Sequence, residues 1–266
     1  MKKDSKERLI LVTNDDGVHA KGLLSLIEVL KEFGRVVVVG PKETSSGMGH
    51  AITVKVPLRI KKLEEAENFE FFLCTGTPVD CVKMANSVIL DRKPDLLVSG
   101  INHGPNSAAS VFYSGTMGAA LEGALMGVPS VGFSLADYHA DADFTLAKKY
   151  VRIIVSKLVQ HELPFNYCLN VNIPAIPEDY INGIKICRQT KGYWEEDFEK
   201  RTDPGNKDYY WLTGKFVNLE PEAEDTDEWA LNNNYVSIVP ISIDMTANKG
   251  IEELKNWHLE DDEQEA

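Results

Sequence analysis

The 266-residue sequence has little of what several protein classes require. It has no run of about 18 uninterrupted apolar residues, which a membrane-spanning helix needs, and its first ten residues lack the apolar segment of a secretory signal. Cysteine is scarce, with four residues and no Cys-x-x-Cys pair, which argues against a disulfide scaffold and the common zinc sites. Since each cysteine adjoins an apolar run, we expect buried, reduced thiols and a cytoplasmic protein with no membrane partner.

Positive charge is also scarce. The chain has 28 Lys and Arg residues against 41 Asp and Glu residues, and a net charge of −13. Much of the excess lies in two stretches without a basic residue, 220–228 and the C-terminal tail 259–266, so the rest of the chain is nearly neutral. Because a protein that binds duplex nucleic acid needs a basic surface, we exclude that partner and interpret the acidic stretches as solvated surface.

Apolar runs alternate with segments of helical periodicity along the first 175 residues. The apolar runs predict strands at 8–13, 35–39, 69–74, 95–98, 130–135 and 167–171. The periodic segments predict helices at 22–33, 78–90, 115–126 and 142–161. Because most of the apolar runs do not alternate with polar residues, we expect strands that are buried on both faces. The pattern therefore predicts a doubly wound α/β fold with a mostly parallel, Rossmann-like sheet.

We expect one domain over residues 1–266, in which a core at about 8–177 is completed by a late strand at 235–243. The alternating stretch 51–56 interrupts the rhythm and is interpreted as an arm of a hairpin. The extension at about 178–234 is aromatic and charged and lacks the β-α alternation. We interpret it as a protruding hairpin that pairs with another subunit.

The first predicted strand ends in Asn14-Asp15-Asp16-Gly17. Ligands of open α/β sheets bind at the carboxyl ends of the strands, and two adjacent carboxylates there repel each other. Successive strand residues point to opposite faces, so both carboxylates can reach one ion only where the chain turns, as Gly17 allows. The tetrapeptide is compatible with a divalent cation, and the alternative is an Asx-type turn without metal.

Two later loops offer further polar groups at strand ends. Residues 41–50 contain serines and glycines, and residues 99–116 end in Ser114-Gly115-Thr116 at a helix start, where free N–H groups bind anions. The motifs GxxxxGK[ST] and GxGxxG are missing, which argues against a P-loop and a dinucleotide cofactor. The oxygen donors of the three loops favour Mg²⁺, Mn²⁺ or Ca²⁺ over zinc.

Five segments carry a resemblance to a known family. They are ILVTNDDG at 10–17, P-x4-S-G at 41–47, PDLLVSGINHGPN at 94–106, YSGTMGAALEGAL at 113–125 and YVSIVPI at 235–241. Together they resemble the SurE family of 5'/3'-nucleotidases, which are metal-dependent phosphomonoesterases. The sequence departs from the family at Asn232–Asn234, where relatives often have glycine.

The resemblance implies a SurE-like fold, one divalent cation per subunit, most readily Mg²⁺ or Mn²⁺, and a homodimer or homotetramer joined through the C-terminal extension. It implies hydrolysis of nucleoside 5'-monophosphates, with 3'-monophosphates and short polyphosphate as further substrates.

The resemblance also assigns roles to individual residues. The metal ligands that it implies are Asp15, Asp16, Ser46 and Asn102. On the phosphate side we place Asn14, Gly47, Gly104, Asn106, Ser114, Gly115 and Thr116. We assign catalysis to Asp15, Asn106 and Ser114, with Asp15 orienting or deprotonating the attacking water.

Several alternatives remain open at this point. His103 and His50 lie in the candidate loops, where they either act on phosphate or are structural. The aromatic residues that either bind the base or pack in the core are Phe112, Tyr113, Tyr193 and Trp194. The rival functions are a non-catalytic nucleotide- or phosphate-binding protein and a metal-dependent deacetylase, although the sequence lacks the HxxDD and HExxH patterns typical of zinc hydrolases.

Overall fold

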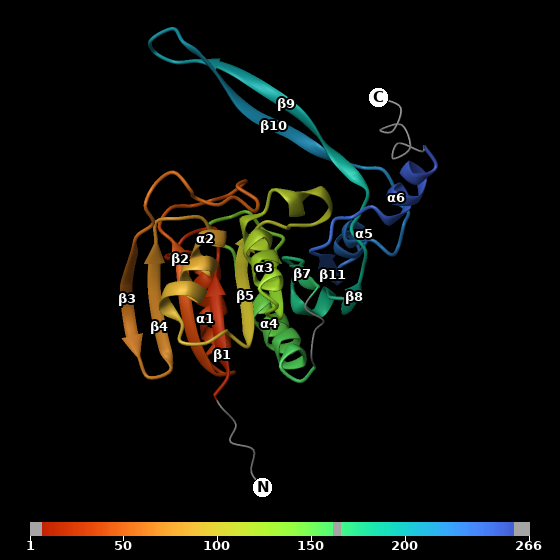
Figure 1. The fold of residues 1–266 in the computed structure, drawn as a ribbon. Coiled ribbons are helices and arrows are strands. Elements are labelled where there is room, and N and C mark those ends of the chain that lie inside the picture. Colours follow the sequence, from red (N-terminus) through yellow and green to blue (C-terminus); the bar gives the residue numbers. More distant parts are fainter. Residues whose placement is uncertain (1–6, 162–165, 258–266) are drawn as a thin grey trace, which may run out of the picture.

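The computed structural model describes residues 7–161 and 166–257. Its centre is a nine-stranded sheet in the order β3-β4-β2-β1-β5-β6-β7-β11-β8 (Figure 1). The strands are β1 (Leu9–Thr13), β2 (Arg35–Pro41), β3 (Ile60–Ala66), β4 (Phe69–Cys74), β5 (Leu96–His103), β6 (Ser130–Leu135), β7 (Tyr167–Ile173), β8 (Ile184–Ile186) and β11 (Val236–Ser242). The six strands from β4 to β7 in this order run parallel, so their carboxyl ends share one edge.

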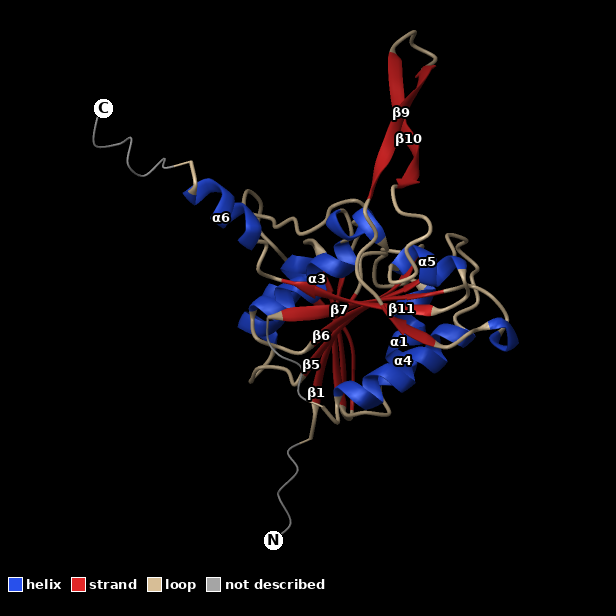
Figure 2. Cartoon of the chain, turned by 90° about the vertical axis from the view of Figure 1, so that its right-hand side faces the viewer, coloured by secondary structure: helices blue, strands red, loops and turns tan. Residues whose placement is uncertain are grey.

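Helices cover both faces of this sheet (Figure 2). One face carries α1 (Lys21–Leu30) and α4 (Thr145–Leu158), and the other carries α2 (Pro78–Met84) and α3 (Gly115–Leu125). Within β1, Ile10 and Val12 belong to the apolar core on the first face, whereas Leu9 and Leu11 belong to the core on the second. Because the central strands β1 and β2 are buried on both faces, their sequences are mostly apolar. The doubly wound α/β fold is thereby confirmed.

The stretch 51–56 is a loop, so the predicted hairpin arm is wrong. Polar groups of a neighbouring segment hold this loop, since Thr77 Oγ1 donates to the Ala51 carbonyl (2.7 Å) and Thr53 N–H donates to Asp80 Oδ1 (3.1 Å). The antiparallel edge strand is instead β3, which pairs with β4. A backbone whose hydrogen bonds go to side chains does not need a strand partner.

Two smaller expectations have different outcomes. The helix predicted at 78–90 divides into α2 and a π-helical turn at Ala85–Ile89. All four cysteines are buried and free, as expected.

The C-terminal part adds strands and helices outside the β-α rhythm. The late strand is β11, antiparallel to β7, and the protruding hairpin consists of β9 (Gly192–Thr202) and β10 (Asp208–Asn218) (Figure 1). The remaining helices are α5 (Asp227–Asn232) and α6 (Asn248–Lys255). Within the described ranges, no helix is long and apolar enough to cross a bilayer. The acidic tail at 259–266 lies outside the described residues.

Candidate active site

The turn after β1 places the two aspartates at the carboxyl edge of the sheet. Asn14 Nδ2 donates to the Gly17 carbonyl (2.9 Å) and closes the turn, while Gly17 has a φ of +95°, which glycine adopts without strain. Asp15 is buried and Asp16 is half-buried. The chain therefore turns directly after β1, which allows the two neighbouring carboxylates to approach one ion.

The Asp15 carboxylate lies against the N-terminus of α3. Thr116 Oγ1 donates to Asp15 Oδ1 (2.6 Å), and a Cβ atom at Gly115 would come within 2.8 Å of Asp15 Cβ. Glycine is therefore required here for the close approach of helix and carboxylate. Burial, with a further contribution from Asp16, raises the pKa of Asp15 to about 6.

Asp16 is held from the other side, because the backbone N–H of His103 donates to its Oδ2 (3.3 Å). Burial raises the pKa of Asp16 as well. Two neighbouring carboxylates that burial already penalises are stabilised by a positive charge placed between them. This arrangement favours the metal interpretation of the turn over a simple Asx turn.

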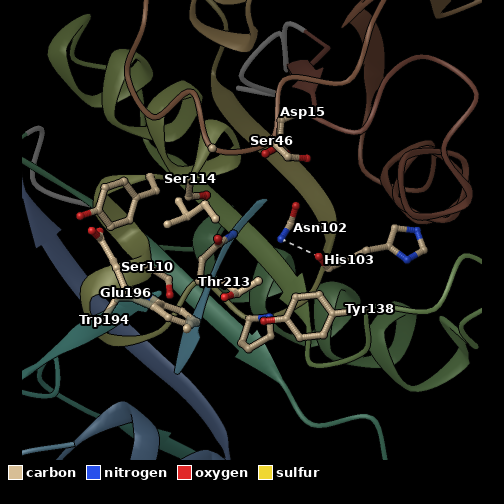
Figure 3. Close-up of a pocket in the computed structure, with 16 residues that line it drawn as sticks. Asp15, Ser46, Asn102, His103, Ser110, Ser114, Tyr138, Trp194, Glu196 and Thr213 are labelled. Atoms are coloured by element: carbon tan, nitrogen blue, oxygen red, sulfur yellow. Dashed lines mark hydrogen bonds between the residues drawn. The ribbon is translucent and has the colours of Figure 1, made fainter. Parts of the chain in front are cut away.

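Asn102 supplies a neutral oxygen to the same place. Its Nδ2 donates to the carbonyls of His103 (3.1 Å) and Gly104 (2.8 Å), which orients the amide and leaves Oδ1 for another partner. Figure 3 shows this amide oxygen on the side of Asp15 and Ser46. Asp15, Ser46 and Asn102 line one cavity.

The two serines of the 41–50 loop have different surroundings. Ser45 donates its backbone N–H to the Asp15 carbonyl (2.8 Å), while Ser46 is exposed and lines the cavity. This favours Ser46 as the hydroxyl ligand. Carboxylates, a hydroxyl and an amide oxygen fit a hard divalent cation. No cluster of three or more His, Cys, Asp or Glu residues that could hold a metal occurs within residues 7–161 and 166–257.

Asn106 and Ser114 form the next part of the cavity wall. Asn106 Nδ2 donates to Ser134 Oγ (2.8 Å), and its backbone N–H donates to Asn172 Oδ1 (2.7 Å). Ser114 is the N-cap of α3, where its Oγ accepts the N–H of Met117 (3.0 Å). Buried side chains thus fix Asn106, and the helix backbone fixes the Ser114 hydroxyl.

The cavity has a volume of about 550 Å³ (Figure 3), within the range of small-molecule sites. One wall comes from the core and the other from the hairpin. The lining residues are Asp15, Ser46, Gly47, Asn102, His103, Pro105, Asn106, Ser110, Tyr113, Ser114, Tyr138, Trp194, Glu196, Leu212, Thr213 and Gly214.

The sequence-predicted residues divide into two groups. Those that line the cavity are Asp15, Ser46, Gly47, Asn102, Asn106 and Ser114. Those that lie behind the lining or beside it are Asn14, Asp16, Gly104, Gly115 and Thr116. The Thr116 hydroxyl is committed to Asp15, so its side chain is a support for the carboxylate.

The histidines and aromatic residues also differ in position. His103 lines the cavity and its Nδ1 lies 3.0 Å from the His139 carbonyl, whereas His50 pairs with Glu122 outside the lining. Tyr113 and Trp194 line the cavity, and Phe112 and Tyr193 do not. Sequence reasoning missed Tyr138, Glu196 and 212–214. Side chains alternate along a strand, so a strand predicted through Trp194 would have placed Glu196 on the same face.

Comparison with known proteins agrees with this geometry. A family model described as "Survival protein SurE" matches residues 10–196. The chain belongs to the SurE family. Two curated relatives named 5'-nucleotidase SurE are similar over nearly the whole chain. The protein of Christiangramia forsetii is 51% identical (97% of this chain and 100% of the relative), and that of Flavobacterium psychrophilum is 54% identical (94% and 98%).

A solved member of the SurE family extends the comparison to the fold. The crystal structure of the SurE protein from Aquifex aeolicus matches with a TM-score of 0.80 at 39% identity, covering 94% of this chain and 99% of that chain. The match therefore includes most of the extension as well as the core.

Proposed function

We propose that the protein is a metal-dependent phosphomonoesterase that hydrolyses nucleoside 5'-monophosphates to nucleoside and phosphate. The observation that carries the proposal is one cavity that contains Asp15 and Asn102 beside the N-terminus of α3. A phosphate monoester needs a site for its dianion and a group that positions water, and this cavity offers both. Relatives about 50% identical over nearly the whole chain bear the name 5'-nucleotidase.

A divalent cation would be held by Asp15, Asp16, Ser46 and Asn102, and when bound it would polarise a phosphoryl oxygen and acidify water. The residues of the chain do the rest. The Ser114 hydroxyl and the first N–H groups of α3 bind the phosphate oxygens, because a helix N-terminus favours an anion. Asn106 is held rigidly and orients the phosphate by hydrogen bonding. Asp15 orients the attacking water in the buried end of the cavity.

We extend the proposal to substrates, assembly and location. 3'-Monophosphates and short polyphosphate present the same kind of terminal phosphate, so we expect both to be hydrolysed as well. Toward its tip the hairpin exposes the aromatic side chains of Phe198, Tyr209, Tyr210 and Trp211, which are suited to contact with a second copy, so we expect a homodimer or homotetramer. Four buried, free thiols suit the reducing cytoplasm.

The test is phosphate release from AMP, GMP, 3'-AMP and p-nitrophenyl phosphate. Each assay is run in EDTA and then with Mg²⁺, Mn²⁺ or Zn²⁺ restored. We expect release that needs Mg²⁺ or Mn²⁺ and that is faster with the nucleotides than with the aryl ester. Nucleotide binding without release under every metal would instead identify a binding protein, and zinc-dependent amide hydrolysis would identify a deacetylase.

A further inference from the structure

One face of the hairpin forms the wall of the cavity opposite the aspartates. Strands β9 and β10 pair in antiparallel register, with Trp194 opposite Phe216 and Glu196 opposite Gly214. Side chains alternate along a strand, so Trp194 and Glu196 project from the same face, together with their cross-strand partners. Trp194, Glu196 and Gly214 all line the cavity, which identifies this face as the inner one.

The inner face presents an aromatic pair beside a carboxylate. The rings of Trp194 and Phe216 meet edge to face at 6.1 Å between centroids. Gly214 is directly opposite Glu196, and a Cβ atom at this position would come within 2.4 Å of the Glu195 carbonyl oxygen, so no side chain stands across from the carboxylate. Because Trp194 and Glu196 are two residues apart on one strand and line the same cavity, a planar group resting near Trp194 has its edge within reach of Glu196.

Glu196 differs from its neighbour on the outer face. Glu195 forms an ion pair with Lys215 (3.0 Å), whereas no ion pair of Glu196 is found within the described residues. Glu196 is therefore available to accept hydrogen bonds from a ligand. In Figure 3, Glu196 and Trp194 are separated from Asp15 and Ser46 by the width of the cavity, so a phosphate at the metal end leaves the base at the hairpin.

The chemistry of a carboxylate distinguishes the nucleobases. Guanine presents two adjacent donors, N1–H and N2–H, on its Watson–Crick edge, which match the two oxygens of a carboxylate. Adenine presents one donor beside the N1 acceptor, whose lone pair faces the second oxygen unfavourably. Enzymes commonly read an unpaired base by hydrogen bonds to this edge and by stacking on aromatic side chains.

We propose that the inner face of the hairpin is a base-recognition subsite in which Trp194 packs against the base and Glu196 selects guanine nucleotides. The subsite rests on the proposed function, since the phosphate at the far end of the cavity fixes where the base lies. Tyr113 and Tyr138 contribute apolar surface from the core side of the cavity.

The first experiment measures kcat/KM for GMP and AMP in the native protein, in Glu196→Gln and in the matched control Glu195→Gln. A hydrogen bond to a charged group is stronger than one between neutral groups, and solvent weakens it. Because Glu196 is exposed, we expect a modest preference for GMP of about 10-fold. In Glu196→Gln the preference disappears or shifts to AMP, because the glutamine Nε2 donates to adenine N1. Glu195→Gln keeps the native ratio.

A binding experiment separates this proposal from the proposed function. Guanosine and adenosine, which have no phosphate to be hydrolysed, are titrated into the protein by calorimetry in EDTA. We expect tighter binding of guanosine to the native protein and to Glu195→Gln, with the preference lost in Glu196→Gln. A guanosine preference without phosphate release from any nucleotide would overturn the proposed function and leave the subsite standing. Equal binding of both nucleosides to the native protein, or an unchanged preference in Glu196→Gln, would overturn the subsite.

Discussion

The part of the core wall formed by Asp15, Asn106 and Ser114 is buried and densely hydrogen-bonded, whereas the hairpin wall is largely open to solvent. Asp15, Asn106 and Ser114 are 3%, 6% and 5% exposed, against 38% for Trp194 and 62% for Leu212. The groups assigned to chemistry are thus fixed before substrate arrives, as catalysis by positioning requires. The hairpin wall has fewer constraints and is the place where substrate preference is most easily altered.

A single buried carboxylate joins the two walls. Asp227 Oδ1 accepts the N–H of Thr190 (2.9 Å) at the root of the hairpin, and Asp227 Oδ2 accepts the N–H of Ala108 (2.8 Å) in the loop after Asn106. An isolated two-stranded hairpin is marginally stable, so this attachment at its root matters for its position. The two walls therefore differ in rigidity but share an anchor.

The most severe way to break the core wall is to remove one of its carboxylates. In Asp15→Asn or Asp16→Asn we expect the metal-dependent kcat for AMP to fall by about 10³-fold or more, because charge compensation for the cation is lost. Steady-state kinetics with Mg²⁺ or Mn²⁺ measure the loss. Near-UV circular dichroism should remain native in both variants. Full turnover in both would contradict the metal assignment.

The buried carboxylate of Asp15 should lower the free energy of unfolding at neutral pH when no metal is present. The pKa of Asp15 is about 6 in the fold against 3.8 for an ordinary aspartate, so the folded state holds its proton more tightly. The protonated Asp15 side chain contributes fully to the free energy of unfolding below about pH 4, and this contribution is lost as the pH rises through about 6. The full difference amounts to about 3 kcal/mol of unfolding free energy.

Urea unfolding in EDTA between pH 4 and pH 7 tests this expectation. Asp15→Asn removes the titrating group and should flatten the profile relative to the native protein, so that the variant is the more stable one at neutral pH. Parallel profiles for the two proteins would show that folding does not raise the pKa of Asp15. Burial of its carboxylate would then not lower the free energy of unfolding.

The two walls also differ in how far the sequence predicts them. The NDDG turn, the Ser114 cap and the strands of the core follow from local signals, namely apolar runs and helix-start residues that adjoin them. The loop at 51–56 could not be predicted, because its backbone is held by Thr77 and Asp80 from another segment. Glu196 was missed because its role depends on the pairing with Gly214 and on the approach of the hairpin to the core.

The hairpin wall can be tested as a separable unit. Replacing residues 193–217 by a short Gly-Ser linker removes Trp194 and Glu196 while leaving Thr190 on Asp227. We expect the KM for GMP to rise about 10- to 30-fold, since base contacts worth about 1.4–2 kcal/mol are lost. Hydrolysis of p-nitrophenyl phosphate, which has no base, should change less than the hydrolysis of GMP. Equal losses for both substrates would show that the hairpin supports the core wall itself.

The smallest effect is expected at Glu122, which connects the core wall to the loop that carries Ser46. Glu122 on α3 is buried and accepts hydrogen bonds from Lys83 Nζ (2.5 Å) and His50 Nε2 (3.0 Å), which lower its pKa. His50 ends the loop that carries Ser46, so Glu122 fastens this loop to the helix. In Glu122→Gln we expect a loss of about 1 kcal/mol, which lowers the Tm by about 2–4 °C at neutral pH.

The pH dependence identifies the cause of that loss. A lowered pKa stabilises the fold above the ordinary value of 4.5, and the contribution is lost as the pH falls through the lowered value. The difference in Tm between native protein and Glu122→Gln should therefore shrink as the pH is lowered below the ordinary carboxyl pKa of 4.5. Since the loop positions Ser46, the variant should also need about three times more Mn²⁺ for half-maximal activity, whereas Glu195→Gln should not. An unchanged Mn²⁺ requirement would mean that the Ser46 loop is held independently of α3, and that the rigid wall ends at Asp15.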